Sequence, residues 1–357
     1  MSDASFPARY WHATPDGKIT CDLCPRDCRL AEGQRGMCFV RKREGDAMVL
    51  TTYGRSSGFA LDPIEKKPLA HFYPGSSVLS FGTAGCNLAC KFCQNWDISK
   101  SREMDRLADR ASPEAIAEAA VEAGAASVAF TYNDPVIFAE YAMDVADACH
   151  ERGVRTVAVT AGYVRDEPRR DFFAKMDAAN VDLKAFTEEF YRRETASELA
   201  PVLETLEYLA RETRVWTEIT TLLIPGRNDS DREIGELSAW IAEKLGPDVP
   251  LHFSAFHPDY RMTDVPATPL STLRRAREIA RAEGLRFVYT GNVHDPEGDT
   301  TSCPACGEAV IVRDWYEIVS ANLVRGACGA CGAPMPGRFG DAVGSFGRRR
   351  VRLKLGA

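Results

Sequence analysis

The chain has 357 residues, of which 45% are hydrophobic, and its 51 acidic and 44 basic side chains give a formal net charge of −7 at pH 7. A chain of this length can bury one large core and carry small appended modules. The negative net charge argues against a broadly electrostatic nucleic-acid binder. The sequence has no run of about 18 apolar residues and no apolar leader at its start, so we expect a cytoplasmic protein without a membrane span.

Eleven of the twelve cysteines fall into three tight groups, which in a large chain indicates reduced, metal-binding thiols rather than disulfides. The N-terminal cysteine group is Cys21, Cys24, Cys28 and Cys38, and we assign residues 1–61 to this cysteine-rich segment. Its spacing fits no common zinc pattern closely. Zinc, an auxiliary iron–sulfur cluster and a thiol-rich turn without metal therefore all stay open.

The central loop cysteines are Cys86, Cys90 and Cys93, in a CxxxCxxC spacing. Structural zinc sites are normally closed by four protein ligands, and cubane clusters are usually held by four cysteines. Three thiolates leave one iron of a cubane cluster open, so we expect an external ligand to complete the site. A zinc knuckle that borrows a distant fourth ligand is the alternative interpretation.

Strand and helix patterns alternate from this loop onward. Strands are expected at 77–81, 127–131, 155–160, 181–184, 215–224, 252–256 and 286–289, and helices at 112–124, 135–152, 201–212, 231–245 and 270–283. Seven strands that alternate with helices predict an α/β fold with a parallel sheet. Over residues 62–295 this pattern suits a partial TIM-like (β/α) barrel with its site at the carboxyl ends of the strands.

The C-terminal cysteine group is Cys303, Cys306, Cys328 and Cys331, which form two CxxC pairs. Two such pairs, separated by short alternating segments, predict a structural zinc ribbon or a rubredoxin-like iron site over residues 296–340. The basic tail, residues 341–357, is expected to be a solvated terminus. Binding of nucleic acid through the ribbon and tail is the less favoured alternative.

The central loop, with Phe92 before its last cysteine, resembles the radical S-adenosylmethionine (SAM) superfamily. More narrowly, the chain resembles the enzymes that activate glycyl-radical proteins such as pyruvate formate-lyase, and more closely their relatives called AmmeMemoRadiSam system radical SAM enzymes. The matching segments are 21–26, 85–96, 131–135, 182–184, 224–229 and 252–260.

This resemblance implies that Cys86, Cys90 and Cys93 hold a [4Fe-4S] cluster whose open iron binds SAM, with Phe92 beside the cofactor. Reductive cleavage of SAM then gives a 5′-deoxyadenosyl radical, which abstracts hydrogen from an unidentified substrate. That substrate is either a glycyl-radical-type protein or a small molecule. The reaction requires an external one-electron donor, and the family name implies Memo-type and Ammecr-type companion proteins.

The resemblance also assigns contacts with SAM. Asn133 and Asp134 follow the second strand, where the superfamily usually has a Gly-Gly-Glu segment that holds the methionyl ammonium group; the glycines are absent here. Asp182 and Lys184 end the fourth strand on one face and are expected to face the cofactor. The alternative from another class is a non-catalytic, metal-stabilised module that grips RNA or protein, which the alternating pattern and the incomplete ligand set disfavour.

Overall fold

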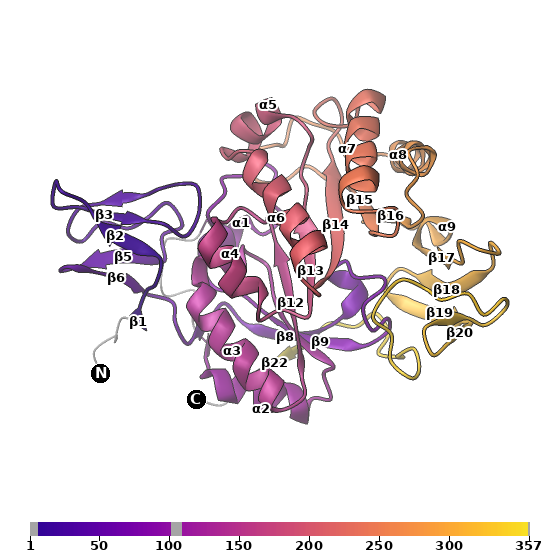
Figure 1. Cartoon of the computed structure of the whole chain (residues 1–357), viewed down its shortest axis with the longest axis horizontal. Helices are drawn as coiled ribbons and strands as arrows, with labels where there is room; N and C mark the ends of the chain where they lie inside the picture. The colour runs from indigo at the N-terminus through magenta and orange to yellow at the C-terminus, as the bar shows by residue number, and fades with distance from the viewer. Residues whose placement is uncertain (1–5, 101–108, 356–357) are drawn as a thin grey trace.

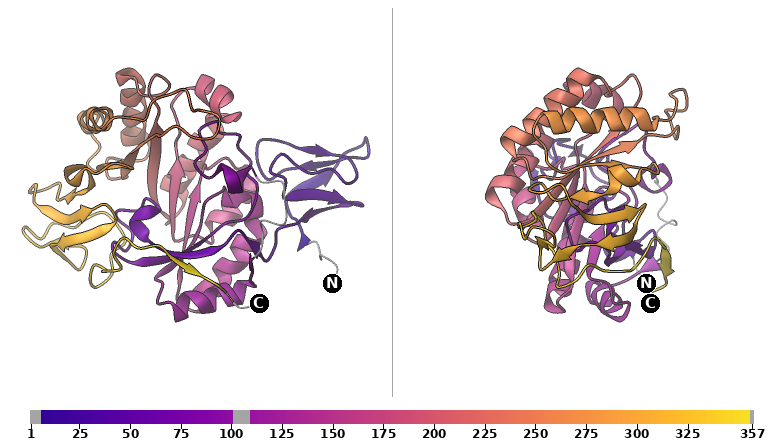
Figure 2. Two further views of the ribbon diagram at one scale, coloured as in Figure 1. Left: turned by 180° about the vertical axis from the view of Figure 1, so that it is seen from behind. Right: turned by 90° about the vertical axis from the view of Figure 1, so that its right-hand side faces the viewer.

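The structure is a computed structural model that describes residues 6–100 and 109–355. Residues 1–5, where we expect no leader, lie outside the described ranges, as do residues 356–357 of the tail. Figures 1 and 2 show a large α/β unit with a small β module at each end of its long axis. No helix in the described ranges is both long and apolar enough to cross a membrane.

Within the described residues, the central sheet has nine strands in the order β16-β15-β14-β13-β12-β11-β9-β8-β22. The strands from β9 to β16 are parallel and follow one another in sequence order, which confirms the predicted mostly parallel α/β sheet. Their bounds are β9 (Ser77–Phe81), β11 (Ser127–Phe130), β12 (Arg155–Thr160), β13 (Ala178–Asp182), β14 (Trp216–Leu223), β15 (Leu251–Ala255) and β16 (Val288–Gly291).

Helices cover the sheet: α2 (Pro113–Glu122), α3 (Ala139–Glu151), α4 (Asp166–Phe173), α6 (Ala200–Glu212), α7 (Asp231–Lys244) and α8 (Leu270–Ala282). Capping serines in the sequence set the starts of two of these helices. The Ser112 hydroxyl accepts from the backbone N–H of Ala115, and Ser230 caps α7 in the same way. Helix α4 was not predicted, because five of its eight residues are charged and its apolar residues lack a helical repeat.

Two further strands were also not predicted. Strand β8 (Phe59–Pro63) lies antiparallel to β9, and β22 (Val351–Leu353) lies antiparallel to β8. The basic tail thus returns across the molecule to the sheet edge, although Val351 itself stays largely exposed. The edge backbone of β8 finds its hydrogen-bond partner in this way.

The N-terminal module consists of short antiparallel strands: β1 (Phe6–Pro7), β2 (Trp11–Ala13), β3 (Ile19–Cys21), β4 (Arg29–Leu30), β5 (Arg41–Glu44) and β6 (Ala47–Leu50). A buried ion pair joins this module to α3. Arg41 donates to the carboxylate of Glu140, and these two side chains are 1% and 3% exposed. Arg41 also donates to the backbone carbonyl of Arg9 at 2.8 Å.

Replacing Glu140 with Gln leaves Arg41 as a buried charge without a counter-charge. Removal of one partner of such a pair typically costs about 3–5 kcal/mol. We therefore expect Glu140→Gln to lower the free energy of unfolding by about 3 kcal/mol, measured by urea denaturation followed by circular dichroism. Asp147→Asn is the control, because Asp147 lies on the same helix and pairs with Lys175 at the surface. A comparable loss in both variants would contradict the assignment.

Candidate functional site

The central loop follows β9 directly and lies at the carboxyl edge of the parallel strands. Its backbone is held by a second segment, because the N–H groups of Ala89 and Lys91 donate to the carbonyls of Thr195 and Glu194, both at 2.9 Å. These carbonyls belong to an irregular helical turn, Tyr191–Thr195. Two backbone hydrogen bonds therefore fix the middle of the loop, between Cys86 and Cys93, against this turn.

Two glycines permit the close packing of this loop. A Cβ added at Gly82 would lie 2.2 Å from the carbonyl oxygen of Thr131. Gly85 has φ +84°, and a Cβ there would lie 2.0 Å from the carbonyl oxygen of Cys38, in the N-terminal module. Neither position accepts a side chain without displacement of backbone.

Asn133 pins the start of the same loop. Its Oδ1 accepts from the backbone N–H of Thr83 at 3.1 Å, and its Nδ2 donates to the carbonyl of Gly85 at 2.9 Å. Asn133 is buried, and both atoms of its amide are used by the loop. The structure therefore brings this predicted residue to the site in a positioning role, and its contact with SAM stays a prediction.

Asp134 lies buried beside it. Its carboxylate accepts from the hydroxyl of Thr160 at 2.9 Å and from the backbone N–H groups of Val136 and Ala161, both at 3.1 Å. Burial raises the pKa of Asp134, and these hydrogen bonds oppose the rise. The negative charge of Asp134 acts on the Cys86 thiol and raises its pKa further, after burial. Asp134 thus lies close to Cys86, and its contact with SAM stays a prediction.

Asp182 and Lys184 also converge on the loop. They form an ion pair of 2.8 Å, and the Lys184 ammonium lies 6.0 Å from the centroid of the Phe92 ring. Burial raises the pKa of the Cys90 thiol to about 12, and the charge of Lys184 opposes that rise. The structure therefore brings Lys184, which follows β13, next to Phe92 and Cys90 of the central loop, and whether they contact SAM stays a prediction.

Asn228 is a site residue that sequence reasoning did not single out. Its Nδ2 donates to the carbonyls of Lys184 and Leu222 at 2.7 and 2.9 Å, and its Oδ1 accepts from the N–H of Ile224 at 2.7 Å. One amide thus fixes the end of β14 against the segment that carries Lys184. The signal in the sequence is an asparagine in a turn just after a strand, which is too common to be specific.

The distances between sulfur atoms distinguish two kinds of cysteine group. In the C-terminal cysteine group, Cys303 and Cys331 lie 3.7 Å apart, and Cys306 and Cys328 lie 3.8 Å apart. Ligands of one tetrahedral ion with bonds of about 2.3 Å are separated by about 3.8 Å. This group therefore fits a single metal ion, whose identity the thiols do not specify.

The central loop cysteines do not share that spacing. Over residues 6–100 and 109–355, only the C-terminal group brings three or more thiol, imidazole or carboxylate ligands within 4.8 Å of one another. Cysteines that hold a cubane cluster each bind a different iron, so their sulfur atoms lie farther apart than ligands of one ion. The central loop thus fits a cluster better than a single zinc ion.

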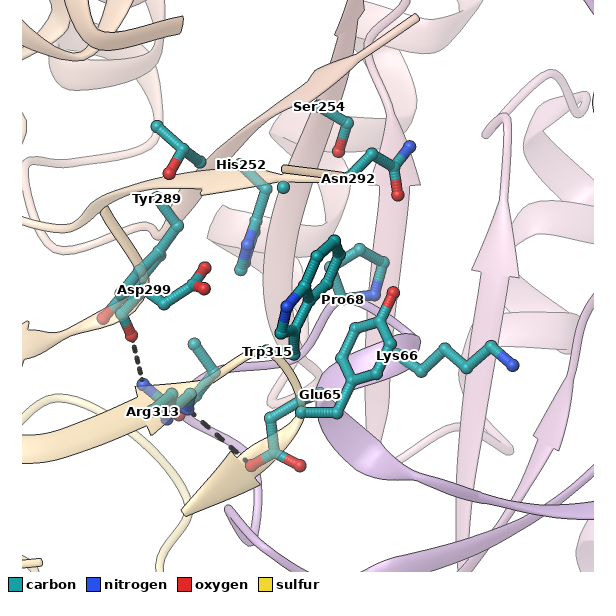
Figure 3. Close-up of a pocket in the computed structure, with 14 residues that line it drawn as sticks. Glu65, Lys66, Pro68, His252, Ser254, Tyr289, Asn292, Asp299, Arg313 and Trp315 are labelled. Atoms are coloured by element: carbon teal, nitrogen blue, oxygen red, sulfur yellow. Dashed lines mark hydrogen bonds and ion pairs between the residues drawn. The ribbon is translucent and has the colours of Figure 1, made fainter. Parts of the chain in front are cut away.

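A pocket lies on the inner face of the same sheet, next to the C-terminal module (Figure 3). About 580 Å³ of empty space, partly open to solvent, lies between β15, β16, the short turn Ile64–Lys66 and the hairpin of β18 (Ala309–Asp314) and β19 (Glu317–Ala321). In the register of the sheet, Asp182, Thr220, His252 and Tyr289 form one row. Paired residues of neighbouring strands point to the same face of the sheet. The side chains of this row therefore extend from Asp182 to His252 and Tyr289, which line the pocket.

The walls of the pocket combine aromatic and charged groups. Arg313 lies between Asp299 and Glu65, donating to the carbonyl of Asp299 at 3.0 Å and lying 3.8 Å from the carboxylate of Glu65 (Figure 3). Burial raises the pKa of both acids to about 7, against the opposing charge of Arg313. Trp315 lines the pocket from the hairpin tip with φ +57°, a conformation uncommon for a bulky residue. Sequence reasoning did not identify this pocket.

Comparison with known proteins identifies the family. Residues 81–237 match the family described as the Radical SAM superfamily. An uncharacterized protein of Methanocaldococcus jannaschii is 38% identical over 327 residues, which are 91% of this chain and 97% of that protein. The pyruvate formate-lyase 1-activating enzyme of Escherichia coli K12 is 23% identical over 232 residues, 60% of this chain and 93% of that enzyme. A radical SAM methyltransferase of Sphaerobacter thermophilus aligns with a TM-score of 0.49 at 18% identity, covering 85% of this chain and 80% of that one.

The fold and the site define an α/β protein with a three-cysteine loop at the carboxyl edge of a mostly parallel sheet. The chain belongs to the radical SAM superfamily. It is thus an enzyme of the kind that this family comprises, with homology to activating enzymes. Membership implies a [4Fe-4S] cluster and SAM, and the three thiols of the central loop fit that cluster.

The C-terminal cysteine group yields a test of its own. Cys306→Ser removes one of four ligands of a single ion, so we expect it to lower the bound metal by about one equivalent per chain and to lower the melting temperature. Metal content is measured by inductively coupled plasma mass spectrometry after removal of weakly bound metal. Cys149→Ala, which changes a buried cysteine outside the three groups, is the control. Unchanged metal content in Cys306→Ser would refute this site.

Proposed function

We propose that this protein is a radical SAM enzyme that cleaves SAM reductively and uses the resulting 5′-deoxyadenosyl radical to take hydrogen from its substrate. The observation that carries the proposal is that Asp134, Asp182 and Lys184 lie close to the central loop. The CxxxCxxC spacing of this loop supplies three thiol ligands and no fourth. When bound at these cysteines, the cluster supplies the electron and the open iron that anchors SAM.

The residues of the chain have separate tasks in this proposal. Cys86, Cys90 and Cys93 hold the cluster, and Lys184 supplies a positive charge near the thiolates. Asp182 orients Lys184 through their ion pair. The buried packing around the loop excludes water, which a reactive carbon radical requires. Phe92 packs on Phe190 with ring centroids 5.8 Å apart and thus forms part of that apolar wall.

The pocket of Figure 3 is proposed as the substrate site. Its rings, together with Arg313 and two acids whose pKa lies near 7, suit a ligand with a flat part and polar groups. These features favour a small-molecule substrate over a glycyl-radical protein, because a peptide of such a protein would have to enter the same space.

The narrower family and the partners are part of the same proposal. The activating enzymes among the relatives support an external one-electron donor and leave a glycyl-radical protein as the competing substrate. We propose membership of the AmmeMemoRadiSam system enzymes, with Memo-type and Ammecr-type companion proteins. Co-purification of such companions with the tagged protein tests this point.

Cleavage of SAM is the direct test of the function. Anaerobically reconstituted protein is expected to release 5′-deoxyadenosine from SAM with dithionite, measured by liquid chromatography and mass spectrometry. Cys90→Ala should reduce this product by at least about 100-fold, because the cluster loses one of three protein ligands. Cys149→Ala is the matched control, since it changes a cysteine away from the loop. Persistence of the product in Cys90→Ala would refute the site assignment.

Lys184 gives a finer test of the cofactor contacts. Lys184→Gln removes the positive charge at the loop while keeping most of the side-chain volume. We expect about tenfold weaker binding of SAM, a loss of about 1.4 kcal/mol, measured by equilibrium binding to the reconstituted protein. Lys175→Gln serves as the control, because this lysine pairs with Asp147 at the surface. Equal affinity in both variants would exclude Lys184 from cofactor binding.

A further inference from the structure

The N-terminal cysteine group lies outside the residues that match the family and has no task in the proposed reaction. Three of its four thiols are buried, and Cys28 is half-buried. The backbone N–H of Cys21 donates to the carbonyl of Cys28 at 3.0 Å across the turn that contains Cys24, and the sulfur atoms of Cys28 and Cys38 both lie next to Gly36. The four cysteines, spread over the first module, are thus gathered at one place in space.

Their spacing excludes a site for one tetrahedral ion in the arrangement seen here. Within the part of the chain that the structure describes, no three of these four sulfur atoms lie within 4.8 Å of one another. The C-terminal cysteine group, in the same structure, has the narrow spacing of a single-ion site. Neither the N-terminal group nor the central loop has this single-ion spacing among the described residues, and the expected occupant of the central loop is a cubane cluster.

Gly36 lies beside two of these sulfur atoms. A Cβ added at Gly36 would lie 3.7 Å from the sulfur atoms of both Cys28 and Cys38. Gly36 is not among the residues with positive φ, so its backbone conformation does not require glycine. A methyl group at Gly36 would thus make ordinary contact with both sulfur atoms, whereas a larger side chain would extend into the space beside them.

The same module contacts the central loop on both sides of Cys86. The carbonyl of Cys38 packs directly on Gly85, whose next residue is Cys86. Arg26 donates from Nε to the carbonyl of Asn87 at 2.8 Å. One close backbone contact therefore links a cysteine of the N-terminal group to a cysteine of the central loop. On the outer side, Met37 is 40% exposed and its N–H lies 3.5 Å from the sulfur of Cys28.

We propose that Cys21, Cys24, Cys28 and Cys38 hold a second [4Fe-4S] cluster that relays single electrons to the cluster of the central loop. The donor is a low-potential carrier protein of the flavin or iron–sulfur class, which docks where Cys28 and Met37 approach the surface. This inference rests on the proposed function. One electron enters and leaves the relay cluster for each SAM cleaved, so the relay undergoes no net change. The electron is consumed in homolysis of the sulfur–C5′ bond, which yields methionine and the 5′-deoxyadenosyl radical.

The first test isolates the N-terminal site from the central one. A variant with Cys86→Ala, Cys90→Ala and Cys93→Ala should still bind about four irons and four acid-labile sulfides, whereas the unaltered chain should bind about eight sulfides. Sulfide is counted because a single iron at the C-terminal group carries none. Electron paramagnetic resonance of the reduced triple variant should show a cluster signal. Zinc, or no sulfide, in the triple variant would overturn the proposal.

Gly36→Val provides a second variant that keeps all four cysteines. In the triple-variant background it should lose most of the remaining iron and sulfide while the circular dichroism spectrum stays unchanged. Ala13→Val is the control, because it places the same valine side chain at an exposed position of the same module. Full retention of sulfide in Gly36→Val would overturn the assignment of this space to a cluster.

The relay is tested by comparing two reductants. With Cys24→Ala and Cys28→Ala combined, the rate of 5′-deoxyadenosine release with reduced flavodoxin should fall at least tenfold relative to the rate with dithionite. An unchanged ratio of the two rates would overturn the relay. If the unaltered chain releases no 5′-deoxyadenosine with either reductant, the proposed function fails, while the sulfide count of the triple variant still decides the N-terminal site.

Discussion

The close packing of the chain after β9 is the constraint on which the site depends. Gly82 lies against the carbonyl of Thr131, and Gly85 lies against the carbonyl of Cys38, with no room for a side chain at either position. Asn133 then ties the same few residues to the loop after β11. The three thiols are therefore positioned by backbone contacts with two neighbours rather than by the loop alone. A site that must hold a cluster and a reactive cofactor requires such preorganisation.

The parallel sheet explains why residues far apart in sequence reach this loop. The carboxyl ends of its strands lie along one edge, so Asp134, Asp182 and Lys184 converge although β9, β11 and β13 are separated by helices. The register extends this relation along the sheet, because Asp182, Thr220, His252 and Tyr289 share a row. The inner face thus connects the cysteine loop with the pocket beside the C-terminal module.

The sequence was most informative where a repeat or a spacing encodes the structure. The seven parallel strands were predicted because continuous apolar runs alternate with amphipathic helices, whereas the polar helix α4 carries no such repeat. The narrow spacing of the C-terminal cysteine group follows from two CxxC pairs that the C-terminal module brings together. Strand β22 and the pocket at Trp315 could not be predicted, since both depend on contacts between the C-terminal residues and the sheet. Asn228 was missed for the same reason, because its partners are carbonyls of two different segments.

The two small modules are too short to bury a core alone, and the structure solves this in two ways. Residues of the C-terminal module, among them Cys303 and Val310, share one apolar cluster with Phe287 and Tyr289 next to and within β16. Cysteines of the N-terminal group instead belong to the main core of the α/β unit. Each module therefore combines a thiol site with burial against the sheet. Because Cys303 and Tyr289 pack in one cluster, a change in the C-terminal cysteine group also alters the wall of the pocket. This contact couples the stability of the module to the shape of the proposed substrate site.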